Sequence, residues 1–152
     1  MPERTQTLQP LTADFDTGLI ESLYTASDGP SLSFLSGLLS HITCRAWVLL
    51  NDEQPVAAIW YQCVAERAEL LDLRVRASCR RQGFGKQLLW ASLVALEGVT
   101  QVDLEVRDSN TAARALYHSL SFEETGCRPA YYAQDQGREG AVLMTLALNN
   151  RV

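Results

Sequence analysis

The segment 80–86, which reads Arg-Arg-Gln-Gly-Phe-Gly-Lys, constrains the fold of this chain more than any other stretch. It joins a strand-like run, 69–75, to a helix-like run, 87–97. Gly83 and Gly85 have no Cβ, so a ligand can approach the main chain closely, and the free N–H groups and positive dipole of a helix start favour an anion. The segment therefore predicts a diphosphate-binding turn, or else a glycine-softened turn with basic neighbours.

Two common phosphate-binding motifs do not fit these residues. A Walker A loop needs glycine where this chain has Arg80, and serine or threonine where it has Gln87. A Rossmann fingerprint belongs to the first βα unit, whereas this segment lies in the middle of the chain and follows several strand-like runs. Both interpretations are therefore rejected.

Length and charge limit the class of protein. The 152 residues, 47% of them hydrophobic, predict one domain over 1–152 with its own core. A net charge of −5 and a pI near 5.0 argue against nucleic acid as a partner. No run of 18 apolar residues occurs and the N-terminus is polar, so the sequence predicts a cytoplasmic protein that does not enter a membrane.

The cysteines give no sign of a metal site. Cys44, Cys63, Cys79 and Cys127 form no CxxC pair, and the chain has only 2 histidines. We therefore expect no bound metal and reduced, structural thiols. Cys79 adjoins the glycine segment, but a nucleophilic thiol also needs a basic activator nearby, which disfavours a catalytic role.

The hydrophobic pattern predicts alternating helices and strands. Helices are expected over 12–26, along the stripe 35–42, over 87–97 and over 111–120. Strands are expected over 44–50, 56–64, 69–75 and 101–107, from 122 onward, and over 141–148. The resulting order ααβββαβαββ predicts an α/β (α+β) fold, in which a mixed, mostly antiparallel sheet is flanked by helices and strand 101–107 runs parallel to 69–75.

Several strings in this order resemble the GNAT N-acetyltransferases. The acetyl-CoA signature of that family is met by Arg80, Gly83 and Gly85. The string LEVRDSNTAARALYHSLSFEETG, followed by RPAYY and GREGAVLM, is similar to the RimI-type branch, whose members acetylate the N-terminal alanine of a small-subunit ribosomal protein. The resemblance covers roughly 71–145, and it implies the GNAT fold and acetyl-CoA as co-substrate.

The resemblance also assigns the cofactor contacts. It implies that backbone amides hold the CoA diphosphate and that a strand pairs with the pantetheine arm. The diphosphate would be bound by Arg81, Gln82, Gly83, Phe84, Gly85 and Lys86, and the pantetheine arm by Leu73, Arg74 and Val75. Asn110 matches a further cofactor contact, although its side chain could equally cap the helix that follows.

Acetyl transfer from a thioester needs a group that takes a proton from the amine and one that returns a proton to the departing sulfur. Glu105 matches the family's base and Tyr117 its acid. From spacing alone, Glu105 is a solvated acid on the polar face of a strand, and Tyr117 is an aromatic side chain packed on the sheet. Tyr131 matches a residue that binds the backbone of the acceptor.

Two departures from the family pattern stand out. Ser121 replaces a usual glycine and indicates a different turn, and 27–32 lacks the aromatic segment that shapes the acceptor groove of the RimI-type branch. The leading expectation is a monomeric enzyme that acetylates a ribosomal protein N-terminus. The alternatives are acetylation of a small-molecule amine and a non-catalytic module that binds acyl-CoA.

Overall fold

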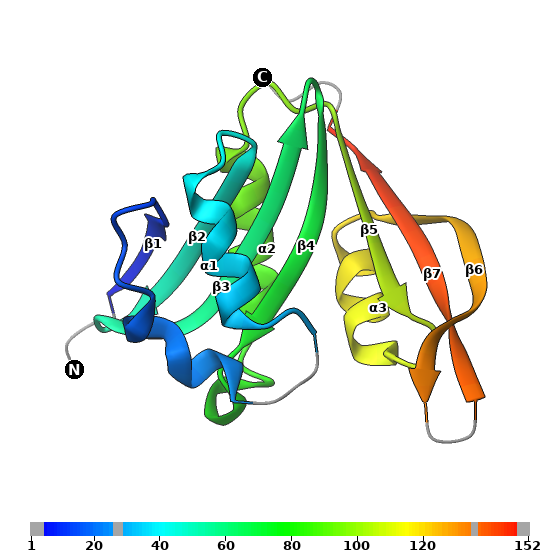
Figure 1. The fold of residues 1–152 in the computed structure, drawn as a ribbon, viewed down its shortest axis with the longest axis horizontal. Helices are drawn as coiled ribbons and strands as arrows, with labels where there is room; N and C mark the ends of the chain where they lie inside the picture. The colour runs from blue at the N-terminus through cyan, green and yellow to red at the C-terminus, as the bar shows by residue number, and fades with distance from the viewer. Residues whose placement is uncertain (1–4, 26–28, 135–136, 149–152) are drawn as a thin grey trace. The chain divides into compact units, whose positions relative to one another are not determined.

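The computed structural model describes residues 5–25, 29–134 and 137–148, of which 130–134 and 137–139 are described by their backbone only. The strands form a seven-stranded sheet in the order β1-β2-β3-β4-β5-β7-β6 (Figure 1). The chain divides into two compact units, 1–63 with 71–97 and 64–70 with 98–152. Strand β4 contributes to both units, which are described in turn.

The first unit contains the N-terminal strands and the shorter helices. Its strands are β1 (Gln6–Pro10), β2 (Cys44–Asn51), β3 (Gln54–Val64) and the second half of β4 (Arg67–Val75). Its helices are the 3-10 helices η1 (Thr17–Tyr24), η2 (Leu38–Ser40) and η3 (Ala77–Cys79), and the α-helices α1 (Leu32–Gly37) and α2 (Phe84–Ala95). β1–β2 and β2–β3 pair antiparallel.

The start of the chain differs from the sequence prediction. The helix expected over 12–26 is the shorter 3-10 helix η1, because Asp16 accepts a hydrogen bond from Gly18 N at 3.0 Å and so starts the helix later. The second helix begins at Leu32, capped by Ser31, and tightens into η2 from Leu38. Strand β1 was not predicted, because its polar sequence QTLQP does not have the alternation of a buried strand.

Alternate residues of β2 and β3 face two separate cores. Ala46, Val48 and Trp60 pack with Ile20 and Leu35 from η1 and α1. The opposite face carries Trp47 and Tyr61, whose rings meet edge-on at 6.0 Å, and the Tyr61 hydroxyl lies 2.7 Å from Ser92 of α2. Helices α1 and α2 therefore cover opposite faces of these strands (Figure 1).

The second unit holds β5 (Gln101–Arg107), α3 (Thr111–Ser119), β6 (Glu123–Gln134), β7 (Gly137–Ala147) and the first residues of β4. β4 and β5 pair in parallel, with Glu69 opposite Asp103, which confirms the predicted crossover. β5–β7 and β6–β7 are antiparallel. The observed sheet is mixed and mostly antiparallel, as predicted.

Two irregular positions in this unit have clear physical reasons. Strand β6 continues past Pro129, because it is the last strand of the sheet and its register shifts between Arg128 and Tyr132. Ser121 has φ 74°, the left-handed region that favours glycine. The turn after α3 thus keeps a conformation suited to glycine, although serine occupies it.

Among the described residues, no helix is long and apolar enough to cross a membrane.

Candidate active site

The start of α2 is built to accept an anion. Gly83 occupies the N-cap position with φ 83° and has no side chain with which to cap the helix. The first helical hydrogen bond runs from Gln87 N to Gly83 O at 3.0 Å, so the N–H groups of Phe84, Gly85 and Lys86 precede the helical ladder. A ligand with several acceptor oxygens, such as a diphosphate, can satisfy these donors.

The side chains around this turn leave its backbone accessible. Arg80, Arg81, Gln82, Gly83 and Lys86 are all exposed, whereas Phe84 turns into the core and anchors the helix. Arg81 has φ 64°, a second left-handed position just before Gly83. The exposed cationic side chains flank the amides with positive charge, which suits the predicted diphosphate.

The predicted pantetheine strand is described at Leu73, Arg74 and Val75, at the end of β4. Arg74 is buried despite its charge, with only 8% of its surface exposed. Its guanidinium forms an ion pair with Asp72 at 3.3 Å. A cofactor role for Arg74 therefore concerns its backbone, because its side chain is engaged within the unit.

Asn110 caps α3. Its Oδ1 accepts a hydrogen bond from Ala113 N at 3.2 Å, and the residue is exposed. This is the capping role that the sequence left open beside a cofactor contact. The first turn of α3 thus differs from that of α2, because a side chain of the protein already satisfies one of its donors.

Glu105 projects from β5 into a groove of about 260 Å³. Its side chain is 25% exposed, and its Oε1 lies 3.0 Å from Nη2 of Arg128 on β6. Two further carboxylates, Glu69 and Asp103, line the same groove. Glu105 is therefore more enclosed than the solvated surface acid that spacing alone predicts, and it holds a cationic nitrogen donor.

Asp103 is held by neighbours and is not available as a second base. Its Oδ1 accepts hydrogen bonds from Thr145 Oγ1 at 2.8 Å and from Gln101 Nε2 at 3.0 Å. Thr145 in turn lies 3.2 Å from the hydroxyl of Thr125. Asp103 thus accepts hydrogen bonds from hydroxyl and amide donors, whereas Glu105 pairs with the long side chain of an arginine.

Tyr117 lies on α3 with its ring buried. It is 7% exposed, and its ring centroid lies 5.6 Å from that of Phe122. The ring is therefore packed, as the spacing predicts, but the contact shown is with Phe122 just before β6. A phenol fixed in this way has few rotamers left, which also suits a proton donor that must keep one position.

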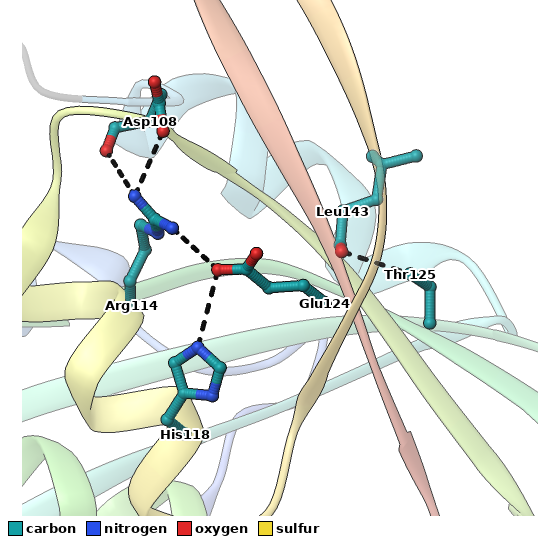
Figure 2. A network of polar contacts seen from close by, with 6 residues as sticks. All are labelled: Asp108, Arg114, His118, Glu124, Thr125 and Leu143. Carbon is teal, nitrogen blue, oxygen red and sulfur yellow. Dashed lines mark hydrogen bonds and ion pairs between the residues drawn. The ribbon is translucent and has the colours of Figure 1, made fainter.

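A polar network fixes the end of β5, α3 and β6 to one another. Arg114 contacts Asp108 at 3.0 Å and Glu124 at 2.7 Å, and His118 lies 3.5 Å from the same Glu124 oxygen (Figure 2). The hydrogen bond from Arg114 lowers the pKa of Glu124 below its usual range. The network holds α3, and with it Tyr117 and Asn110, against β6.

The remaining predicted residues add less to the description of the site. Tyr131 lies in β6, but its side chain is outside the described part of the structure. The four cysteines are free thiols, and burial raises the pKa of Cys44 and of Cys63, which favours the unreactive thiol form. Within the described ranges, no group of three or more His, Cys, Asp or Glu side chains could hold a metal ion.

The site can now be compared with known proteins. The family model described as "Acetyltransferase (GNAT) family" matches residues 12–122. The chain belongs to the GNAT acetyltransferases. This GNAT enzyme is therefore an acetyl-CoA-dependent N-acetyltransferase, and the predicted family, fold and co-substrate are confirmed.

A curated relative and two solved structures illustrate the likeness. The [ribosomal protein bS18]-alanine N-acetyltransferase of Salmonella typhimurium is 40% identical over 103 residues, which are 66% of this chain and 70% of the relative. The crystal structure of the ribosomal-protein-S18-alanine N-acetyltransferase from Escherichia coli has TM-score 0.85 at 30% identity and covers 97% of this chain and 99% of that one. Arabidopsis thaliana NAA60 with a bisubstrate analogue shares the fold alone, with TM-score 0.80 at 15% identity, covering 97% of this GNAT chain and 100% of its own.

Two functional features were missed by sequence reasoning. The first is the ion pair between Glu105 on β5 and Arg128 on β6. It forms across β7, which lies between these two strands in the sheet, so the sequence gives no sign of it. The ion pair between Asp72 and Arg74, and its burial, were also not predicted. An Asp and an Arg two residues apart on one strand face are a signal for such a pair, but not for its burial.

Proposed function

We propose that this chain transfers the acetyl group of acetyl-CoA to the N-terminal α-amine of ribosomal protein bS18, where the acceptor residue is alanine. The uncapped start of α2, with its three N–H groups ahead of the helical ladder, is the structural observation that carries the CoA half of the proposal. Similarity to the bS18-alanine N-acetyltransferases supports the acceptor half. A cytoplasmic location follows from that substrate. We also propose that the enzyme is a single domain over 1–152 and acts as a monomer.

In this mechanism the CoA diphosphate binds the backbone of 81–86, and the pantetheine arm pairs with the backbone of Leu73, Arg74 and Val75. Glu105 takes a proton from the acceptor ammonium, directly or through a water. The neutral amine then attacks the thioester carbon, the new C–N bond forms and the C–S bond breaks. Tyr117 gives its proton to the departing thiolate, and the second proton of the amine leaves the new amide nitrogen and returns through water to the Tyr117 phenolate.

The ion pair at Glu105 bears on how the acceptor enters. Arg128 holds Glu105 at 3.0 Å through a cationic N–H donor, which is the same kind of group that a protonated N-terminus offers. The acceptor ammonium replaces this guanidinium before it gives up its proton. Arg128 is 52% exposed, so its side chain can move toward solvent when the acceptor ammonium takes its place at Glu105.

The test is an acetylation assay with a peptide that carries the bS18 N-terminal sequence. The purified protein should consume acetyl-CoA and add one acetyl group at the α-amine. Glu105→Gln and Tyr117→Phe should each lower turnover about 10²-fold or more without loss of acetyl-CoA binding. Asp103→Asn is the matched control for Glu105→Gln, since it removes a carboxylate from the same groove and should cost far less.

Two other outcomes would replace the proposal. Consumption of acetyl-CoA only with free amines such as polyamines or amino acids would assign a small-molecule acceptor. Binding of acetyl-CoA with no turnover, and with no effect of either substitution, would indicate a non-catalytic acyl-CoA-binding module. In cells, intact-mass analysis of ribosomal proteins should show bS18 lacking one acetyl group when this protein is absent.

A further inference from the structure

Tyr117 is anchored by the residues that follow α3. Its carbonyl oxygen accepts hydrogen bonds from Leu120 N and from Phe122 N, both at 3.1 Å. Its ring packs on that of Phe122, with 5.6 Å between the centroids. Phe122 leads directly into β6, so the position of Tyr117 depends on how α3 lies against that strand.

Glu124 on β6 contacts α3 on both sides of Tyr117. Its Oε1 accepts a hydrogen bond from Arg114 Nη2 at 2.7 Å and lies 3.5 Å from His118 Nε2 (Figure 2). Arg114 lies about one turn before Tyr117, and His118 directly follows it. A single carboxylate thus holds the helix at two points that flank the proposed proton donor.

Arg114 extends these contacts to β5. Its Nη1 donates to the carbonyl oxygen of Asp108 at 2.9 Å and to Asp108 Oδ1 at 3.0 Å (Figure 2). Asp108 directly follows β5, which carries Glu105, and its N–H donates to Gly140 O of β7 at 3.0 Å. Arg114 therefore connects the helix of the proposed acid to the strand of the proposed base.

We call the four side chains of this network, all from the second unit, the α3 clamp: Asp108, Arg114, His118 and Glu124. The clamp is partly open to solvent, because the side chain of Arg114 is 27% exposed and that of Glu124 is 42% exposed. Ion pairs of this exposure add little to stability. The Nε of Arg114 is enclosed and has no hydrogen-bond partner among the described residues, which is a cost. The position that the clamp gives to α3 therefore explains it better than stability does.

We propose that Glu124 is a positioning residue for the proton donor: through Arg114 it fixes α3 on β5 and β6, and with the helix it fixes the Tyr117 phenol. Proton transfer to a departing thiolate needs a donor within hydrogen-bond reach, and a displacement of about 1 Å can lower a rate about 10²-fold. Without the carboxylate, Arg114 is tied to the end of β5 alone and α3 can shift against β6. This inference rests on the proposed function, since it needs Tyr117 as the acid, but it holds for any acceptor amine.

The test is a double-mutant cycle between Glu124 and Tyr117. In the wild-type background, Glu124→Ala should lower kcat about tenfold, while the KM for acetyl-CoA stays unchanged because the proposed diphosphate site is intact. In a Tyr117→Phe background, the same substitution should change kcat less than about twofold, since no phenolic proton is left to position. A structural role that does not act through Tyr117 would lower kcat by the same factor in both backgrounds.

Three further variants check the cause of the effect. Arg114→Met removes the guanidinium that Glu124 holds, so it should lower kcat as Glu124→Ala does, with no further loss when the two are combined. Glu124→Gln keeps a side-chain oxygen that can accept from Arg114, and it should retain most of the activity. Glu123→Ala is the matched control and should behave as wild type. It removes an exposed carboxylate of β6 that points to the opposite face from Glu124, because neighbouring residues of a strand alternate.

The inference and the proposed function fail in different ways. If Tyr117→Phe lowers kcat but Glu124→Ala does not, or lowers it equally in both backgrounds, the proton donor stands and the positioning role is overturned. If Tyr117→Phe turns over like the wild type, the proposed acid is wrong and the positioning role is overturned with it. If the protein acetylates only free amines, the peptide acceptor fails, and the same cycle measured with such an amine decides the role of Glu124.

Discussion

The first turns of α2 and α3 show two ways of satisfying the same backbone groups. At α3, Asn110 supplies its own side-chain oxygen to Ala113 N at 3.2 Å. At α2, Gly83 has no side chain and stands at φ 83°, so no side chain caps the donors of the first turn. The protein itself therefore completes the start of α3, whereas we propose that a ligand completes the start of α2.

A third case lies in β4, where Asp72 is buried with an unpaired Oδ2. Burial raises the pKa of Asp72 to about 6, although the attraction of Arg74 lowers it. Below about pH 6 this carboxyl is mostly protonated. The side chain of Asn110 at α3, the proposed ligand at α2 and a proton at Asp72 would thus each satisfy a group that otherwise lacks a hydrogen-bond partner. Each of the three can be changed by a separate substitution.

The largest effect is expected at Gly83. Gly83→Asp places a carboxylate where the diphosphate is proposed to bind, and aspartate tolerates left-handed backbone better than most residues. The Kd for acetyl-CoA should rise about 100-fold or more in a calorimetric titration. Gly98→Asp is the matched control, since Gly98 has φ 72° and open space around it, and it should bind acetyl-CoA like the wild type.

The next effect concerns Asp72 and pH. Its folded pKa of about 6 lies above the ordinary aspartate value of 3.8, so the protonated group favours the folded state. This stability is fully present below about pH 4 and is lost as pH rises through about 6, an effect of roughly 2–3 kcal/mol. Asp72→Asn removes this dependence, so its stability relative to wild type, from urea unfolding, should increase between pH 4.5 and 7.5. A difference that stays constant over this range would show that Asp72 is ionised at both ends.

Asn110→Ala tests whether the cap of α3 is also a cofactor contact. Loss of the cap should lower the free energy of unfolding by about 1 kcal/mol. The Kd for acetyl-CoA should not change if capping is the whole role, and Asn110→Ser should restore the stability. A weaker affinity for acetyl-CoA in both variants would instead support the contact that the family resemblance implies.

The smallest effect is expected at the other end of α3. Ser121 has φ 74°, a conformation that glycine adopts without the steric cost that serine bears. Ser121→Gly should therefore raise the free energy of unfolding by up to about 1 kcal/mol, with turnover unchanged. A loss of stability would show that the serine side chain makes a contact that outweighs the strain.

Local sequence signals predicted the features that depend on neighbouring residues. The glycines of 80–86 predicted the open start of α2, and the alternation in 101–107 predicted β5, because each depends on backbone geometry within a few residues. Strand β1 was missed, since its pairing with β2 is decided by distant partners. The contact of Arg128 with Glu105 was missed for the same reason, because it joins β6 to β5 across the sheet.

Burial was harder to predict than secondary structure. Asp72 and Arg74 look like solvated residues in the sequence, because charged side chains are rarely buried without a partner. Their pairing becomes visible only when the Gly29–Pro30 connection covers β4. Glu105 and Tyr117 were proposed from the family resemblance, and the structure adds their surroundings: a lined groove for the carboxylate and close packing for the phenol.

The most direct test of whether a ligand binds the start of α2 is a titration of ¹⁵N-labelled protein with CoA, monitored by the chemical shifts of the backbone amides. We predict that the amides of 81–86 shift most and saturate with the binding isotherm, while the amides of 111–113 at the capped start of α3 change little. Saturable CoA binding with unshifted amides at 81–86 would contradict the account.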